Sequence, residues 1–127
     1  MSPSIALGSQ TLSGEGKISK IKPVDLELVS QLTAQGRYEF SEHAERERLH
    51  DHFTVDEVKN VAINGELIED YPEDPRGHSC LMLGWSKDGR PIHVVLTILP
   101  TNVVRFITVY EPTKPKWIDP WTRARKE

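Results

Sequence analysis

Residues 64–83 read NGELIEDYPEDPRGHSCLML, and this stretch marks the change from helical to extended structure. Apolar residues recur at helical spacing before Asn64 and at strand spacing after it. The pair Asn64 and Gly65 is a typical helix end, because both residue types accept the left-handed backbone conformation. Helices that precede strands predict a small α+β domain, with the helices packed on one face of a roughly four-stranded antiparallel sheet.

The first predicted helix covers residues 24–35. Pro23 suits the first helical position, where its missing N–H would have no partner in any case. Gly36 suits the end of the helix. The apolar stripe of this helix is formed by Val24, Leu28 and Leu32. Residues 37–40 then form a short strand or an extended lead-in to the next helix.

The second and third helices are marked by their N-caps. Ser41 is a typical capping residue ahead of a short polar helix at residues 42–50. Thr54 and Glu57 stand three apart and match a capping box, which starts the third helix. The apolar face of that helix is formed by Val55, Val58 and Ala62.

Strand signals fill the second half of the chain. Residues 66–71 have the character of an edge strand, and residues 79–85 form a compact apolar segment. An Asp-Gly pair at 88–89 predicts a hairpin turn into the strand at 92–98. The last strand is predicted at residues 103–110.

The two faces of these last two strands differ in polarity. One face of the first is formed by Ile92, Val94, Leu96 and Ile98, and His93 and Thr97 lie on the other. On the last strand, alternation places Arg105 on the face that also carries Val103, Ile107 and Val109.

The chain of 127 residues predicts one domain between two tails. Residues 1–22 are rich in Ser and Gly without apolar periodicity, which predicts a disordered tail. The α+β domain is placed at residues 23–118, and residues 119–127 form a basic tail. Trp117 and Trp121 are expected to fold back onto the sheet, because two tryptophans in a free tail would be unusual.

Composition narrows the class of protein. The net charge of −3 and the pI near 6.0 give no footprint for bulk nucleic-acid binding, so DNA binding by the protein alone is not expected. Cys80 is the single cysteine, so no internal disulfide forms, and without a secretion signal the cytoplasm is the expected compartment. No run near the N-terminus is long enough for a membrane span. No cofactor motif is present.

One candidate site lies on the polar helix. His43 and Arg46 are three residues apart and share a face, and His50 follows on the same side. An imidazole beside a guanidinium suits an anionic substrate, because histidine exchanges a proton near neutral pH and arginine grips a phosphate. The simpler interpretation is a solvated face on which the arginines pair with Glu42, Glu45 and Glu47.

A second candidate lies on the turn after the acidic run. Residues 66–74 hold five acidic residues and no basic one, and Arg76 and His78 follow on a turn stiffened by two prolines. The functional interpretation is contact with a phosphate and proton transfer. The structural alternative is that Arg76 pairs with Asp70 or Asp74 and locks the turn.

Other polar residues have mainly structural interpretations. His93 on a central strand is expected to be a satisfied structural histidine, and Tyr110 either packs or offers its phenol to a cleft. The remaining histidines and Cys80 suit zinc by type, but their spacing matches no zinc motif, so no metal is predicted. Cys80 sits mid-strand and is expected to be a buried, inert thiol.

Short motifs spread over residues 24–121 resemble the domain-of-unknown-function family 4258. They are YEFSEHA from Tyr38, TVDEV from Thr54, NGE from Asn64, DYP from Asp70, DPRG from Asp74, SCL from Ser79, PIHVV from Pro91, ITVYEP from Ile107 and KW from Lys116. The resemblance implies a small α+β toxin of the RelE/BrnT kind, which cleaves RNA without a metal. It also implies a zinc-finger or ribbon-helix-helix antitoxin as partner.

The resemblance suggests roles for individual residues. Such cleavage needs a base for the 2′-hydroxyl, cations for the phosphate and an acid for the 5′-oxygen. The expected catalytic residues are His43, Arg46, Arg76, His93 and Tyr110, and the expected RNA-binding residues are Arg48, His78 and Arg105. Many relatives carry Arg four and eight residues after the motif histidine, where this chain has Glu47 and Asp51. The competing hypothesis is a non-catalytic protein-binding module, in which a basic partner pairs with the acidic strand.

Overall fold

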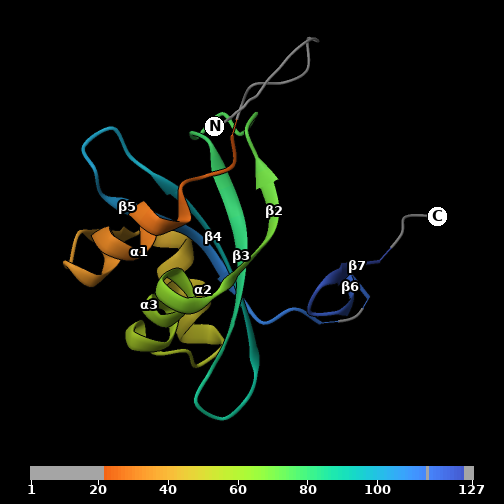
Figure 1. Ribbon diagram of the computed structural model, residues 1–127. Coiled ribbons are helices and arrows are strands. Elements are labelled where there is room, and N and C mark those ends of the chain that lie inside the picture. The colour runs from red at the N-terminus through yellow and green to blue at the C-terminus, as the bar shows by residue number, and fades with distance from the viewer. Residues whose placement is uncertain (1–21, 114, 125–127) are drawn as a thin grey trace, which may run out of the picture.

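The computed structural model describes residues 22–113 and 115–124, so the tail predicted at 1–22 lies almost wholly outside it. Its elements are α1 (Leu26–Ala34), β1 (Tyr38–Phe40), α2 (Glu42–His50), α3 (Val55–Asn64), β2 (Glu66–Tyr71), β3 (Ser79–Trp85), β4 (Pro91–Ile98), β5 (Val104–Tyr110), β6 (Trp117–Asp119) and β7 (Thr122–Arg123). The helices pack against one side of the main sheet, and the β6–β7 hairpin lies on the other side (Figure 1). The predicted α+β class is confirmed.

The main sheet has five strands in the order β1-β5-β4-β3-β2, and the prediction of four antiparallel strands is wrong in this respect. The additional strand is β1, which runs parallel to β5 and places Tyr38 opposite Val104 and Phe40 opposite Phe106. A three-residue segment shows too little alternation to reveal a strand by itself. Its partner β5 also lies far along the chain, so no local sequence pattern predicts that the two strands pair in parallel.

The expected two-faced character of β4 is confirmed, whereas that of β5 needs a correction. Leu96 faces Phe106, but the next pair is Val95 with Thr108, so β5 contains a bulge at this point. The extra residue turns Val109 into the helix-facing core beside Phe106. The prediction that Val109 shares a face with Arg105 is therefore wrong, because alternation counting cannot see a bulge.

The first helix starts two residues later than predicted. Asp25 is its N-cap, with a carboxylate that accepts a backbone N–H of the first turn. The backbone N–H of Val24 donates to Asp70 Oδ1 at 3.1 Å, which ties this residue to β2. Pro23 and Val24 therefore precede the helix rather than begin it. The second helix and the capping box of the third are confirmed as predicted.

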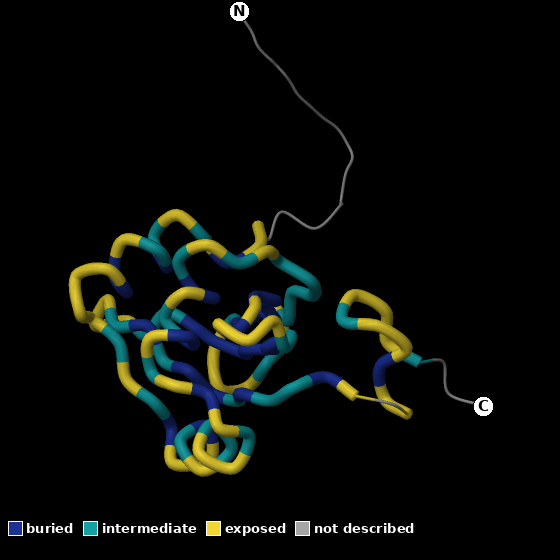
Figure 2. Tube along the Cα trace, turned by 90° about the horizontal axis from the view of Figure 1, so that it is seen from below, coloured by how far each residue is buried: buried dark blue, intermediate teal, exposed yellow. Residues whose placement is uncertain are grey.

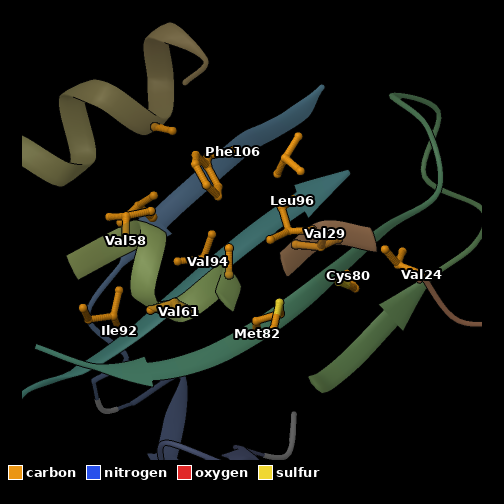
Figure 3. Close-up of a cluster of buried hydrophobic side chains, with 14 of the residues drawn as sticks. Val24, Val29, Val58, Val61, Cys80, Met82, Ile92, Val94, Leu96 and Phe106 are labelled. Atoms are coloured by element: carbon orange, nitrogen blue, oxygen red, sulfur yellow. The ribbon is translucent and has the colours of Figure 1, made fainter. Parts of the chain in front are cut away.

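The main core lies between α1, α3 and the sheet, where valines from the helices meet the apolar faces of β3, β4 and β5 (Figure 3). Gly84 on β3 sets how closely α3 can approach. A Cβ at this position would lie 2.6 Å from Val61 Cγ2 and 3.1 Å from Val61 Cα. The absence of a side chain at residue 84 thus allows helix and strand to pack at this distance.

A smaller core lies on the opposite face of the sheet. Trp117 is 3% exposed and packs with Leu81, Val95 and Ile107. This tryptophan folds back onto the sheet as expected, so the domain boundary predicted after residue 118 falls inside the β6–β7 hairpin. Figure 2 shows that most of this hairpin is exposed while the sheet strands carry the buried residues. Among the described residues, no helix is long and apolar enough to cross a membrane.

The contact between Gly84 and Val61 generates a prediction. Gly84→Ala should destabilise the protein by about 1–3 kcal/mol, because the added methyl group must push α3 away from β3. Val61→Ala removes the nearer of the clashing atoms, so the double variant should lose less stability than the sum of the two single variants. Urea unfolding of all four proteins measures this coupling. Strict additivity would contradict the proposed contact.

Candidate functional site

Three of the residues singled out from the sequence line one cavity of about 270 Å³. His43 comes from the first turn of α2, Arg76 from the β2–β3 turn and Arg105 from β5, and Ser41 and Ile107 complete the described lining. His43 and Arg76, which were both among the expected catalytic residues, therefore line the same cavity. Ser41 and Ile107 were not among the candidate site residues chosen from the sequence.

Ser41 fixes the position of this site. Its backbone N–H donates to the carbonyl oxygen of Phe106, and its hydroxyl donates to that of Ile107, both at 2.9 Å. The same hydroxyl oxygen accepts the N–H of Ala44 at 2.9 Å, as an N-cap does. The start of α2 is thereby held against the bulge of β5, and His43, two residues later, is brought to the cavity.

His43 is oriented by Glu47, a carboxylate that the simpler interpretation of the sequence paired with the arginines of the helix. Its Nε2 lies 3.2 Å from Glu47 Oε1, one helical turn away, and the same oxygen accepts the N–H of Val109 at 3.0 Å. Because a carboxylate only accepts, Nε2 carries a proton in this contact, and Nδ1 is the nitrogen with the free lone pair whenever the imidazole is neutral. An i, i+4 reading of the helix could have found this pair.

Asp51 plays a similar structural role at the end of α2. Its Oδ2 accepts the N–H of Glu111 at 3.1 Å, just beyond β5. Glu47 and Asp51 occupy the two positions at which the resemblance described above implies arginine. In this chain both carboxylates fasten α2 to the backbone of β5, or just beyond it.

Arg76 is locked in place by Asp74, as the structural interpretation of the turn expected. Nε lies 3.0 Å from Oδ1 and Nη2 lies 2.9 Å from Oδ2. Ser79 donates to the same carboxylate at 2.7 Å. The Arg76 guanidinium holds the pKa of the Asp74 carboxyl well below its usual range, although burial by itself would raise it. The pair fixes Arg76 without removing it from the cavity.

Arg105 also has a carboxylate partner, and this carboxylate is more exposed than that of Asp74. Its Nη1 contacts Oε2 of Glu39, the residue opposite it in the β1–β5 pairing. The two side chains are 40% and 44% exposed. Each of the three side chains that can carry a positive charge in the cavity, namely His43, Arg76 and Arg105, thus lies beside one carboxylate.

His93 and Tyr110 lie elsewhere. His93 is fully buried, with Nδ1 3.1 Å from the Tyr110 hydroxyl and Nε2 2.7 Å from the carbonyl oxygen of Pro120. A carbonyl accepts only, so Nε2 carries the proton and Tyr110 donates to Nδ1. Burial lowers the pKa of His93. The expected satisfied structural histidine is confirmed.

The register of the sheet separates this pair from the cavity. His93 is opposite Tyr110, whereas Thr97 is opposite Arg105. The two pairs are four residues apart along β4, which corresponds to a separation of about 13 Å. Neither His93 nor Tyr110 is among the described residues that line the cavity. The assignment of both to the same catalytic group as His43 therefore has no geometric support.

The remaining candidates are also placed outside the cavity. Arg48 is 12% exposed and bound to Glu45 and to the carbonyl oxygen of Phe53, so it serves to fix α2. Arg46 lies 3.6 Å from Glu42 and lines a second hollow along α2 together with His43 and His50. His78 pairs with Asp70 at 2.7 Å. None of these three residues lines the 270 Å³ cavity in which His43 meets Arg76 and Arg105.

The cysteine and the metal-ligand residues form no further centre. Cys80 is fully buried, and burial raises the pKa of its thiol to about 12, so the expected inert thiol is confirmed. Among the described residues, no group of three His, Cys, Asp or Glu side chains could hold a metal ion.

The acidic strand β2 is engaged by the chain itself. Glu66 Oε2 accepts the indole N–H of Trp121 at 2.7 Å, and Glu69 accepts two hydrogen bonds from Arg123 at 2.8 and 3.2 Å. The β6–β7 hairpin therefore already meets these two carboxylates. A basic partner protein would have to compete with these intramolecular contacts.

The Asp74 carboxylate predicts a pH dependence of stability. Its pKa is lower in the folded than in the unfolded protein, so the stabilisation is complete above an unfolded pKa of about 4 and disappears as pH falls through the folded pKa. Asp74→Asn should reduce the free energy of unfolding at pH 7 by about 1–3 kcal/mol. This deficit should shrink steadily below about pH 4.

Urea unfolding of both proteins between neutral and acid pH measures this deficit. Glu73→Gln is the matched control, because Glu73 is an exposed neighbour on the same turn. Its deficit should stay within about 0.5 kcal/mol throughout. A deficit of Asp74→Asn that stays constant down to acid pH would show that the Arg76 pair does not stabilise the turn.

Comparison with known proteins identifies the family but no characterised relative. No curated protein and no solved structure matches the chain. The model of a family described as a domain of unknown function, DUF4258, matches residues 40–111. This range covers more than half of the 127 residues and includes His43, Arg76 and Arg105. The chain therefore belongs to the DUF4258 family.

Proposed function

We propose that this protein is the toxin of a type II toxin-antitoxin system and acts as a metal-independent endoribonuclease. The observation that supports the proposal is the cavity in which His43, Arg76 and Arg105 meet from three separate parts of the chain. One group that exchanges protons near neutral pH and two guanidinium groups can supply the base for the 2′-hydroxyl and the cations for the phosphate.

The proposed first step is proton removal by His43. With its proton on Nε2 directed at Glu47, the free Nδ1 can take the proton of the ribose 2′-hydroxyl. The 2′-oxygen then attacks the adjacent phosphorus, and the bond from phosphorus to the 5′-oxygen breaks. Because the nucleophile belongs to the substrate, RNA is cleaved and DNA is not.

The arginines stabilise the charge that develops on the phosphate. Arg76 is fixed by Asp74 before any substrate arrives, which limits the reorganisation needed in the transition state. Arg105 supplies a second guanidinium from the floor of the cavity. Two planar donors can together take over the charge neutralisation that a metal ion provides in other nucleases.

The 5′-oxygen takes its proton from water in this scheme, and the hydroxide ion that remains takes back the proton held by His43. The described lining of the cavity contains no second side chain that titrates near neutral pH. His93 and Tyr110, the other candidates from the sequence, are bonded to each other at the far end of β4 and β5. The reaction therefore proceeds without a general acid, which limits its rate.

The proposed partner is an antitoxin of the zinc-finger or ribbon-helix-helix class, encoded beside this gene. The alternative of a non-catalytic protein-binding module stays a prediction. It is the weaker of the two, because Glu66, Glu69 and Asp70 of the acidic strand are engaged by Trp121, Arg123 and His78 of the chain itself.

The role of His43 can be tested by separating activity from stability. His43→Ala should reduce RNA cleavage by roughly 100- to 10,000-fold, the usual contribution of a general base. The side chain is 57% exposed, so the free energy of unfolding should change by only about 0.5 kcal/mol. The measurement is cleavage of a labelled single-stranded RNA by purified protein in the presence of a chelator.

His50→Ala is the matched control, because His50 is also an exposed histidine of α2 but lies outside the cavity. It should retain activity close to that of the unchanged protein. The same RNA with 2′-O-methyl groups should resist cleavage, since it lacks the nucleophile. Equal activity of the two histidine variants, or no cleavage by the folded unchanged protein, would reject the mechanism.

A further inference from the structure

We propose that Glu39 is an internal competitor for the phosphate-binding site, which a phosphodiester must displace from Arg105 before it can bind fully. The inference concerns regulation of the site described above and rests on its proposed role in binding RNA. It assigns different tasks to the two arginines and gives β1, the strand that the sequence did not resolve, a part in the function.

The two arginines are held in different ways. Arg76 shares two parallel hydrogen bonds with Asp74, whose side chain is only 6% exposed and also bound by Ser79. If Arg76 left Asp74 to bind another anion, the buried carboxylate would lose its cationic partner, which is strongly unfavourable. Arg76 is therefore a fixed part of the site.

The pair of Arg105 and Glu39 has the opposite character. It joins one guanidinium nitrogen to one carboxylate oxygen, and both side chains are about as exposed as typical surface residues. Exposed pairs of this kind shift an equilibrium by less than about a factor of five. Glu39 also lies on β1, a three-residue strand at the edge of the sheet. Among the described contacts, the Glu39 carboxylate is held by Arg105 alone, so it can turn into solvent when a stronger anion arrives.

Competition by Glu39 has a consequence for selectivity. In the unliganded protein the carboxylate neutralises Arg105 and repels any approaching anion. A phosphate that also contacts Arg76 gains enough to displace Glu39, because it forms charge-assisted hydrogen bonds to two guanidinium groups. A phosphodiester that is held by further contacts of an RNA strand should therefore occupy the site more readily than free phosphate.

The test measures binding separately from cleavage. The probe is a labelled single-stranded RNA with 2′-O-methyl groups, which binds without reacting, and inorganic phosphate serves as a competitor. Glu39→Gln keeps the shape of the side chain and removes its charge. It should bind the probe about two- to five-fold more tightly, the range set by loss of an exposed ion pair. Free phosphate should also compete better with this variant.

Two further variants make the result specific. Glu42→Gln is the matched control, since Glu42 is likewise an exposed partner of an arginine, but its partner Arg46 does not line the cavity with Arg76 and Arg105. It changes the net charge of the protein equally and should leave the affinity unchanged. In the double variant Glu39→Gln, Arg105→Gln the gain should vanish, and Arg105→Gln alone should bind more weakly than the unchanged protein. The urea midpoints show that each variant is folded.

The outcomes separate this inference from the proposed catalysis. Unchanged or weaker binding by Glu39→Gln, or an equal gain in Glu42→Gln, would overturn the competition. If cleavage of unmodified RNA were intact in that case, the nuclease proposal would still stand. A gain that depends on Arg105 in a protein that does not cleave RNA would support the competition and reject the catalysis. Absence of probe binding by every variant would overturn the inference.

Discussion

The site depends on the junction at Ser41, where a helix start is bonded to a strand. Its N–H and hydroxyl donate to two successive carbonyl oxygens of β5, at Phe106 and Ile107, and its hydroxyl also caps α2. Ile107 is the extra residue of the bulge and has no partner on β4, whereas Phe106 pairs with Phe40 and Leu96. A bulge leaves its extra residue outside the ladder. The Ser41 hydroxyl binds the carbonyl group of this residue, and the helix that starts at Ser41 brings His43 to the cavity.

Charge compensation is the second organising feature of the molecule. Arg76 with Asp74, Arg105 with Glu39 and His43 with Glu47 each form a pair, so the cavity can hold cations in a chain whose net charge is −3. The pairs differ in burial, and burial decides their physical role. A carboxylate that is shielded from water fixes its arginine, whereas a solvated one is easily exchanged.

The two sides of the sheet serve different purposes. Toward α1 and α3 the strands are apolar, and Gly84 allows close packing of the helix. On the other side, the β6–β7 hairpin is held at one end of the strands, where Trp117 packs edge-on against the buried His93 and His93 donates to the carbonyl oxygen of Pro120. The cavity with Arg105 lies toward the other end. The same strand face thus carries a structural histidine cluster and a candidate phosphate site without mixing them.

The sequence by itself determined the features that local rules control. The bounds of α2, the capping box of α3 and the alternating faces of β4 follow from side-chain spacing and N-cap chemistry, which act over a few residues. Two candidate residues, His43 and Arg76, could be chosen in the same way because each stands on a polar, locally recognisable segment.

The tertiary structure alone decided which candidates meet. The parallel pairing of β1 with β5 and the contact between Glu39 and Arg105 join residues that are 66 positions apart in the sequence. The bulge in β5 shifts the pairing register by one residue. The same bulge put Val109 in the core, and the strand register removed His93 from the cavity. Such pairings depend on how all the helices and strands together bury their apolar residues, and no short stretch of sequence contains that information.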